Sequence, residues 1–441
     1  MLHAVLTNPF SPVDVLYITF DGLLDPLGQA RKIDLLQRLA CDGLTIAVVS
    51  FEEPDALREE IRTASMRGKL EAQGITWRPL GHRATRSIPT ACWDFVRGAA
   101  TAMRVTVERR PRCLHACGYS SALVGLAVKL AFGGKLIFDM PGFWPEESVE
   151  LGFFRSTHFL YRVSKRLEEA ILEGSDHVVV ATDRAKAVLR DEEAKARLAA
   201  KRSVREKPIS VIPCCVDLER FRPRTQDRML LAGSGLENKL LFGNIGSFNR
   251  RYLAAEMFRF AFHLKKYRPE VTFVYLTPHD PRPLYEAARD AGLADDDIFV
   301  RTVAASDIPR WLSVFRLGVF FVRPSYAAKA SSFAKIGEFL ASGVPVITNT
   351  GVGDLDHLLS EERCGLLLPG LTDRDLDAAA KKALPLLEGD AVPQELRDRC
   401  RQTALDRFGM AHGARRYSSI IRSLEAAGRA VEDHPRAIET G

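Results

Sequence analysis

The chain has 441 residues, of which 46% are hydrophobic and 27% are charged, and this composition excludes a fibrous or largely disordered protein. Its length predicts two domains, and its net charge of +6 favours anionic partners. No stretch approaches the roughly 20 apolar residues of a membrane span. The start of the chain also lacks the basic region of a signal peptide. We therefore expect a cytoplasmic protein whose eight cysteines are reduced.

Short apolar runs alternate with helix-length amphipathic segments through the first half of the chain. The expected strands are VDVLYITF, LTIAVVS, ITWRPL, RCLHA, KLIFD, HVVVAT and PISVIP. Helices are expected between them, at residues 29–42, 54–73, 89–107 and 120–132. Strands that alternate with helices of this length predict βαβ units and a parallel, doubly wound sheet.

The second half repeats this plan with KLLFGNIG, VTFVYLT, DIFVR, LGVFFV, VPVITN and GLLLPG. A segment rich in proline, glycine and charge, residues 213–238, separates the halves and predicts the domain junction. We expect Rossmann-like domains at residues 1–213 and 239–409, and a final helix at 410–441 that returns toward the first domain. Two such domains form a cleft at the carboxyl ends of their sheets, where ligands of these folds bind.

One segment, KASSFAKIGEFLASGVPVITNTGVGD at residues 329–354, combines polar residues with an apolar helix and strand. Two serines precede the helix, whose free N–H groups and positive dipole end suit a phosphate. Lys335 adds positive charge one turn later, and Glu338 is placed to bind a pair of ribose hydroxyls. The segment predicts a phosphorylated ligand, but from spacing alone an N-cap and a surface ion pair fit equally well.

The same segment resembles the donor-binding region of glycosyltransferase family four, retaining GT-B enzymes that use nucleotide sugars. The resemblance continues in the family's order through VLYITFDGLLDPLGQARKIDLLQRLACDGLTIAVVSFE, LHACGYSSALVGLAVKLAFGGKLIFDMPGFWPEE, SDHVVVATDRAKAVL and VIPCCVDLERF, and covers most of residues 13–370. It implies the α/β GT-B fold, with two doubly wound Rossmann-like domains facing across a cleft. It also implies transfer of a sugar, of the hexosyl class, from a nucleotide donor to a hydroxyl acceptor in bacterial-type polysaccharide or glycoconjugate biosynthesis.

The resemblance further implies which residues bind the donor. Glu338 matches the second glutamate of the family's Glu-x7-Glu pair, which holds the ribose. The other donor-binding positions that it implies are Gly28, Gly246, Ser247, Arg250, Ser332, Phe333, Ala334 and Lys335. His115 matches a histidine that points toward the transferred sugar, and Asp139 lies at a loop end where sugar or acceptor contacts are expected. We expect His115 to position the sugar and not to act as a base.

Two positions depart from the family pattern. The first glutamate of the pair falls at Ala330, and Ser247 replaces an arginine, so Arg250, Arg251 or Lys335 is expected to supply the charge. Ala330 favours a donor with fewer hydroxyls, such as a deoxysugar. It also motivates an alternative function, a nucleotide-sugar-binding protein without turnover.

An epimerase or phosphorylase of GT-B type is a further alternative. A nicotinamide oxidoreductase is disfavoured, because no GxGxxG follows the first strand of either domain. The run CLHAC has no second half that would complete a structural zinc site. No metal or cofactor is expected, because a helix N-terminus and cations can stabilise the departing diphosphate.

The segment LGFFRSTHFLYRVSKRLEEAIL, residues 151–172, interleaves aromatic and basic residues. One interpretation is contact with an anionic membrane at its inner face, which would suit a lipid-linked acceptor. The other is ordinary core, with Leu160, Val163, Leu167 and Ile171 packed on the sheet. The expected partners are a nucleotide-sugar donor and a glycan or lipid-linked acceptor, with no nucleic acid.

Overall fold

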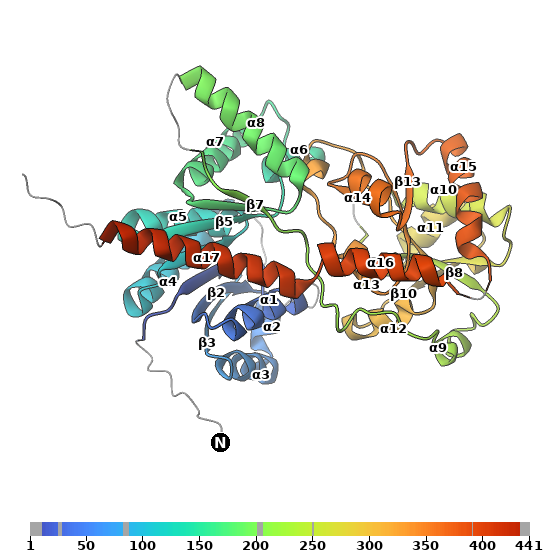
Figure 1. Ribbon diagram of the computed structural model, residues 1–441, viewed down its shortest axis with the longest axis horizontal. Coiled ribbons are helices and arrows are strands. Elements are labelled where there is room, and N and C mark those ends of the chain that lie inside the picture. The colour runs from blue at the N-terminus through green and yellow to red at the C-terminus, as the bar shows by residue number, and fades with distance from the viewer. Residues whose placement is uncertain are drawn as a thin grey trace, which may run out of the picture.

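The computed structural model describes residues 11–24, 29–82, 88–200, 206–248, 251–389 and 391–432. The described chain forms two lobes, each built on one parallel β-sheet and covered by helices (Figure 1). The predicted α/β class with two doubly wound sheets is confirmed. The eight cysteines are all free thiols.

The N-terminal lobe has a seven-stranded sheet in the order β3-β2-β1-β4-β5-β6-β7. Its strands are near-continuous apolar runs, as expected where helices cover both faces of a parallel sheet. The strands are β1 (Val15–Thr19), β2 (Ile46–Glu52), β3 (Ile75–Gly81), β4 (Cys113–Cys117), β5 (Lys135–Met140), β6 (His177–Val180) and β7 (Ile209–Val211). The helices are α1 (Gln29–Cys41), α2 (Pro54–Arg58), α3 (Glu60–Glu71), α4 (Ile88–Arg109), α5 (Tyr119–Phe132), α6 (Trp144–Glu150), α7 (Phe159–Gly174) and α8 (Asp183–Ala200).

The single helix predicted at 54–73 is two helices, α2 and α3. They separate at Glu59, whose ψ of 80° lies outside the helical region.

The C-terminal lobe has a six-stranded sheet in the order β10-β9-β8-β11-β12-β13. Its strands are β8 (Leu240–Ile245), β9 (Val271–Leu276), β10 (Ile298–Arg301), β11 (Phe315–Val319), β12 (Val346–Asn349) and β13 (Gly365–Leu368). Its α-helices are α9 (Arg228–Gly233), α10 (Ala254–Lys265), α11 (Arg282–Asp290), α12 (Ile308–Leu312), α13 (Ala334–Ala341), α14 (Leu355–Glu362), α15 (Asp373–Ala383) and α16 (Gln394–Arg407). The last helix, α17 (Met410–Glu432), returns to the N-terminal lobe. Short 3-10 helices are η1 (Asp295–Asp297), η2 (Ala305–Asp307), η3 (Ala327–Ala330) and η4 (Leu384–Leu387).

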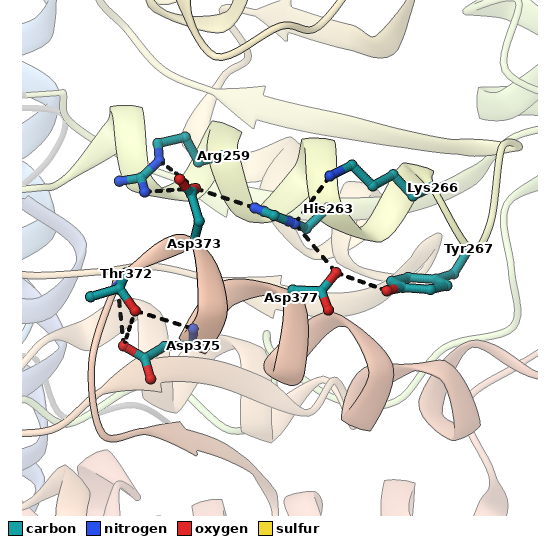
Figure 2. A network of polar contacts seen from close by, with 8 residues as sticks. All are labelled: Arg259, His263, Lys266, Tyr267, Thr372, Asp373, Asp375 and Asp377. Carbon is teal, nitrogen blue, oxygen red and sulfur yellow. Dashed lines mark hydrogen bonds and ion pairs between the residues drawn. The ribbon is translucent and has the colours of Figure 1, made fainter.

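Helices α10 and α15 are joined by a polar network (Figure 2). Arg259 donates to Asp373 over 2.7 Å, and His263 lies 3.2 Å from Asp373 and 3.4 Å from Asp377. Thr372 caps α15 by accepting from the backbone N–H of Asp375. The network fixes these two helices against each other.

The chain crosses between the lobes twice. The first crossing follows β7, and the second joins α16 to α17. The two crossings meet where the N–H of Val216 donates to Phe408 O over 2.7 Å and the N–H of Met410 donates to Val216 O over 3.0 Å. Helix α17 then packs on α1, β4 and β5, and it is the long red helix across the N-terminal lobe in Figure 1. The C-terminal end of the described chain therefore completes the core of the N-terminal lobe.

Candidate functional site

A cavity of about 820 Å³ lies between the two lobes. The N-terminal lobe contributes the end of β6 and the start of α8, including Thr182 and Arg184. The C-terminal lobe contributes the starts of α13 and α14, and the junction of α16 with α17 closes one side. The cavity therefore lies at the carboxyl ends of strands from both sheets, where a ligand of this fold class is expected.

The loop between β11 and α13 is held against the N-terminal lobe by polar contacts. Glu150 in α6 accepts from Ser325 Oγ over 2.7 Å and from the N–H of Ala327 over 3.1 Å. Thr182 Oγ1 donates to Lys329 O over 2.7 Å. These contacts fix the segment that leads into the N-terminus of α13, so both lobes determine its position.

Ala330 lies at the end of this loop and is only 2% exposed. It belongs, with Ala327, to a core cluster of the N-terminal lobe. A glutamate at position 330 would have to place its carboxylate among apolar side chains, at a large desolvation cost. The departure from the family pattern at this position therefore fits its surroundings.

Asp354 joins the lobes at the N-terminus of α8. Its two carboxylate oxygens accept from the N–H groups of Asp183 and Arg184, over 2.7 and 3.1 Å. Burial raises the pKa of the Asp354 carboxyl, and these two backbone donors oppose that shift. Next to it, Arg184 pairs with Asp356 at 2.6 Å. Sequence analysis did not identify this contact, and the acidic residues of GVGDLD, at the start of α14, were its only local signal.

The N-terminus of α13 opens on the cavity, as predicted for the diphosphate site. Ser332 and Phe333 line the cavity, and Phe333 occupies the N-cap position. A phenylalanine side chain has no hydrogen-bond acceptor, so it cannot cap the N–H groups of the first turn. Ser332 Oγ accepts from the N–H of Cys214 over 3.0 Å, which ties this helix end to the interlobe linker. Ala334 is the first helical residue.

Lys335 is buried on another side of the same turn. Its Nζ donates to Asn244 Oδ1 over 3.1 Å and lies 4.0 Å from the centroid of the Tyr252 ring. Gly246, at φ 100°, approaches so closely that a Cβ built on it would lie 3.7 Å from this Nζ. The structure thus brings two of the expected donor-binding residues, Lys335 and Gly246, next to each other.

The charge of Lys335 is sensitive to its surroundings. Burial lowers the pKa of the Lys335 amine to about 7, and the Glu338 carboxylate opposes that shift. The face of the Tyr252 ring also favours the charged form. An anionic ligand arriving at this amine would stabilise its protonated form further.

Arg251 connects the same region to the N-terminal lobe. One guanidinium nitrogen lies 2.9 Å from Glu147 Oε1, and the other donates to Ser331 Oγ over 2.7 Å. The neighbouring Ser247 accepts from Tyr275 Oη through its carbonyl oxygen, over 3.3 Å. The predicted donor residues Gly28 and Arg250 lie outside the described residues.

His115 and Asp139 lie together, but not in the interlobe cavity. His115 is fully buried in the middle of β4, with Nε2 3.4 Å from Asp139 Oδ2. Its ring packs against Tyr17 and Tyr417, and the Tyr417 hydroxyl donates to Asp139 over 2.8 Å. This geometry does not support the expected direct contact between His115 and a sugar.

The residue at the carboxyl end of β4 is Cys117, two positions further along the strand. Burial raises the pKa of its thiol to about 12. Sequence analysis missed Tyr417 because its helix lies almost 300 residues away, and no local pattern connects that helix to β4.

Residues 33–220 match the family model described as Glycosyltransferase Family 4. No curated protein sequence matches the chain. Among solved structures, sucrose-phosphate synthase from Thermosynechococcus elongatus has a TM-score of 0.70 at 17% identity, over 94% of this chain and all of that one. A glycosyltransferase from Rickettsia africae ESF-5 has a TM-score of 0.66 at 13% identity, over 93% of this chain and 98% of that one.

A third similar structure is Anabaena HepE, solved in complex with UDP-glucose. It has a TM-score of 0.65 at 14% identity, over 93% of this chain and all of that one. These likenesses show that both lobes and their arrangement follow one known architecture, the GT-B fold. The chain therefore has the GT-B fold, and residues 33–220 of its N-terminal lobe are similar to the glycosyltransferases of family 4.

Proposed function

We propose that the protein transfers a sugar from a nucleotide-sugar donor to a hydroxyl acceptor with retention of the anomeric configuration. One observation carries the proposal. The buried amine of Lys335 lies beside Gly246, on the same helical turn whose N-terminus opens on the interlobe cavity. The structure of Anabaena HepE with UDP-glucose supports a nucleotide sugar as donor.

The proposed chemistry concerns the leaving group. The bond between the anomeric carbon and the diphosphate oxygen breaks, and the departing nucleoside diphosphate takes the electron pair. Preorganised N–H groups of α13 and the Lys335 ammonium stabilise this growing negative charge. The acceptor oxygen attacks from the same face and forms the new bond to the anomeric carbon, while its proton passes to the departing phosphate.

Lys335 suits this role because its protonation depends on the ligand. With a pKa of about 7 the amine is only partly charged in the free protein near neutral pH. The diphosphate raises that pKa, so positive charge is present when the donor is bound. Glu338, one turn further along α13, is proposed to hold the ribose hydroxyls.

The sugar end of the site has to differ from the family pattern. Ala330 is buried in the core of the N-terminal lobe, and both carboxylate oxygens of Asp354 accept from α8. Neither position offers a free carboxylate to the sugar hydroxyls. This arrangement favours a donor sugar with fewer hydroxyls, such as a deoxysugar.

The second candidate function is a nucleotide-sugar-binding protein without turnover, which the alanine at position 330 favours. Thermal-shift measurements with UDP-, GDP- and dTDP-sugars test binding, because a ligand at 100 times its Kd stabilises the folded state by about 2.7 kcal/mol. Release of nucleoside diphosphate from the best ligand, with and without candidate acceptors, then tests turnover. Binding without any release favours the second candidate, and failure of every donor to bind contradicts both.

A further inference from the structure

Helix α7 turns a mixed polar and apolar face toward the protein. It buries Ser164, Glu168 and Ile171, which are 6%, 2% and 0% exposed. In contrast, Phe159, Val163 and Leu167 are 57%, 45% and 41% exposed, and their spacing forms one stripe along the helix. The expectation that Val163 and Leu167 pack on the sheet is therefore wrong, whereas Ile171 packs in the core as expected and Leu160 is half-buried.

Specific contacts fix α7 in this orientation. Glu168 accepts from the Tyr119 hydroxyl at the start of α5 over 2.6 Å. Lys165 pairs with Glu146 in α6 at 3.0 Å and also with Glu168. Rotating α7 to bury its apolar stripe would break this buried ion pair and leave a charge without its partner. The exposed stripe is therefore a defined feature of the fold.

The apolar surface extends beyond α7. Trp144, at the start of α6, is 47% exposed, and Phe153, in the loop before α7, is 72% exposed. Among the described residues, ten of the fifteen exposed large hydrophobic side chains lie between the start of α4 and the end of α7, in residues 88–174. They are Trp93, Val96, Val107, Leu130, Phe132, Trp144, Phe153, Phe159, Val163 and Leu167. Of these, the stripe on α7 together with Trp144 and Phe153 beside it is the candidate interaction surface.

This surface borders the interlobe cleft. Helices α4, α5 and α7 pack on the same core cluster, so they cover one face of the N-terminal sheet. Helix α6 contacts η3, which belongs to the loop that leads into α13. A partner bound along α6 and α7 would therefore lie beside the opening of the cleft.

Basic side chains accompany the stripe. Arg162 and Arg166 are exposed one turn apart on α7, and Arg155 is exposed in the loop before it. In a two-fold contact with a second copy the same surface meets itself, so these arginines would face each other. An anionic lipid bilayer instead offers phosphates to the arginines and acyl chains to the aromatic and aliphatic side chains. Among the helices that the structure describes, none is long and apolar enough to cross a membrane, and surface docking needs no such helix.

We propose that the α6–α7 surface, formed by Trp144, Phe153, Arg155, Phe159, Arg162, Val163, Arg166 and Leu167, docks on an anionic phospholipid bilayer. Docking holds the cleft at the membrane surface, so the acceptor is carried by a lipid. Only this consequence rests on the proposed transfer reaction, because docking itself is independent of it.

Flotation with vesicles tests the docking. The full chain is mixed with phosphatidylcholine vesicles that contain either no anionic lipid or about one third phosphatidylglycerol. We expect binding to the anionic vesicles only, and weaker binding as salt is added. Each arginine near the surface contributes about fivefold, so the double variant Arg162→Glu/Arg166→Glu weakens binding by at least about 30-fold. The double variant Phe159→Ser/Leu167→Ser weakens it by about tenfold or more. Its remaining binding is more sensitive to salt, because the arginines that attract the anionic lipids are kept.

A matched control variant changes the opposite face of the sheet. Ile61 in α3 is 89% exposed, and the side chain of Arg58 in α2 is 80% exposed. The double variant Ile61→Ser/Arg58→Glu removes the same kinds of side chain and is expected to bind vesicles like the unmodified protein. Nucleotide-sugar binding by every variant is measured separately, so that failure of donor binding is not confused with failure of docking.

Three results would overturn the proposal. The first is an unmodified protein that stays unbound to anionic vesicles at low salt. The second is unchanged vesicle binding by both α7 variants. The third is a purified dimer that the Phe159→Ser/Leu167→Ser variant converts to a monomer without any change in vesicle binding, since the stripe would then be a self-association surface.

Discussion

Replacing Lys335 with methionine is expected to stabilise the fold and to weaken donor binding. Methionine has nearly the same length, so it keeps the packing against Tyr252 while removing a buried amine. Water solvates that amine in the unfolded chain, whereas the folded protein offers it Asn244 and an aromatic face. The variant therefore separates the effect of the buried amine on the stability of the fold from its role in donor binding.

The magnitude follows from the pKa. Burial lowers the pKa of Lys335 from 10.5 to about 7, a difference of 3.5, and each unit corresponds to about 1.4 kcal/mol. The lysine thus costs about 5 kcal/mol of stability at neutral pH. The methionine variant also loses the Asn244 hydrogen bond and the charged contact with the Tyr252 ring, which reduces the gain in stability by about 1–2 kcal/mol. The net gain of Lys335→Met is about 3 kcal/mol.

The pH dependence has a definite sign. Between pH 7 and pH 10.5 the unfolded chain carries a proton on Lys335 that the folded protein does not, so the stability of the unmodified protein rises with pH. Below pH 7 both states are protonated and the full cost applies. The advantage of Lys335→Met is therefore largest at or below pH 7 and shrinks as the pH approaches 10.5.

The assay is thermal and denaturant unfolding at several pH values between 6.5 and 9.5, together with calorimetry of donor binding. Lys329→Met, at a half-buried lysine 4.8 Å from the Tyr326 ring, is the matched control and should show neither effect. A less stable Lys335→Met protein without pH dependence would refute the account of the buried amine. Unchanged donor affinity in that variant would refute its role in binding the diphosphate.

Three further predictions concern the donor site. Glu338→Ala should weaken nucleotide-sugar binding by about 10- to 150-fold, from the loss of one charge-assisted contact of 1.5–3 kcal/mol, with little change in Tm; equal affinities in calorimetry would reduce Glu338 to a structural role. Glu52 accepts from the N–H groups of Leu23 and Leu24 at 2.8 Å, and we expect it to position this turn, which precedes the expected donor-binding residue Gly28. An amide offers only one acceptor oxygen, so Glu52→Gln should raise the donor KM several-fold with kcat less affected. A lower kcat at unchanged KM would contradict this positioning role. Turnover should persist in excess EDTA, because the helix N-terminus and Lys335 are proposed to stabilise the negative charge of the leaving group. If EDTA abolishes activity and Mg²⁺ or Mn²⁺ restores it, a metal ion provides that stabilisation instead.

Local sequence patterns were sufficient to predict the two sheets and the helix α13. Buried parallel strands are continuous apolar runs, and the pattern of α13 places Ile336, Phe339 and Leu340 in the core wherever the helix packs. The approach of Lys335 to the loop after β8 also follows from topology, because β8 and β11 are neighbours in the sheet. These features depend on the order of apolar and polar residues within short segments, which can be read from the sequence.

The position of His115 could not be predicted from its motif. Successive side chains of a strand point to opposite faces, and only the packing of α17 shows which face His115 occupies. Tyr417, which contacts it, comes from that helix. A motif match assigns a role to a residue but does not determine what covers it.

The orientation of helix α7 could not be predicted from its sequence either. Periodicity shows which side chains share a face, but not which face turns inward. Here the face that carries Glu168 turns inward because Tyr119 and Lys165 satisfy that carboxylate, and the contact from Tyr119 is a long-range one that no local pattern contains. The apolar face is left outside, and that outcome favours the membrane interpretation over the ordinary core.

The contact between the lobes explains how a closed site can still admit a donor. Three carboxylates contribute its polar part: Glu147 pairs with Arg251, Glu150 accepts from the loop before α13, and Asp354 caps α8. Ala327 and Ala330 add an apolar part, because they pack in the core of the N-terminal lobe. When the lobes separate, water can replace the polar partners, so opening costs less than it would across a wholly apolar interface of the same size. When they close, the same carboxylates return the loop and the N-terminus of α13 to one geometry. Donor entry and a preorganised leaving-group site are therefore compatible in one molecule, because much of what holds the cleft closed is polar and can be replaced by water.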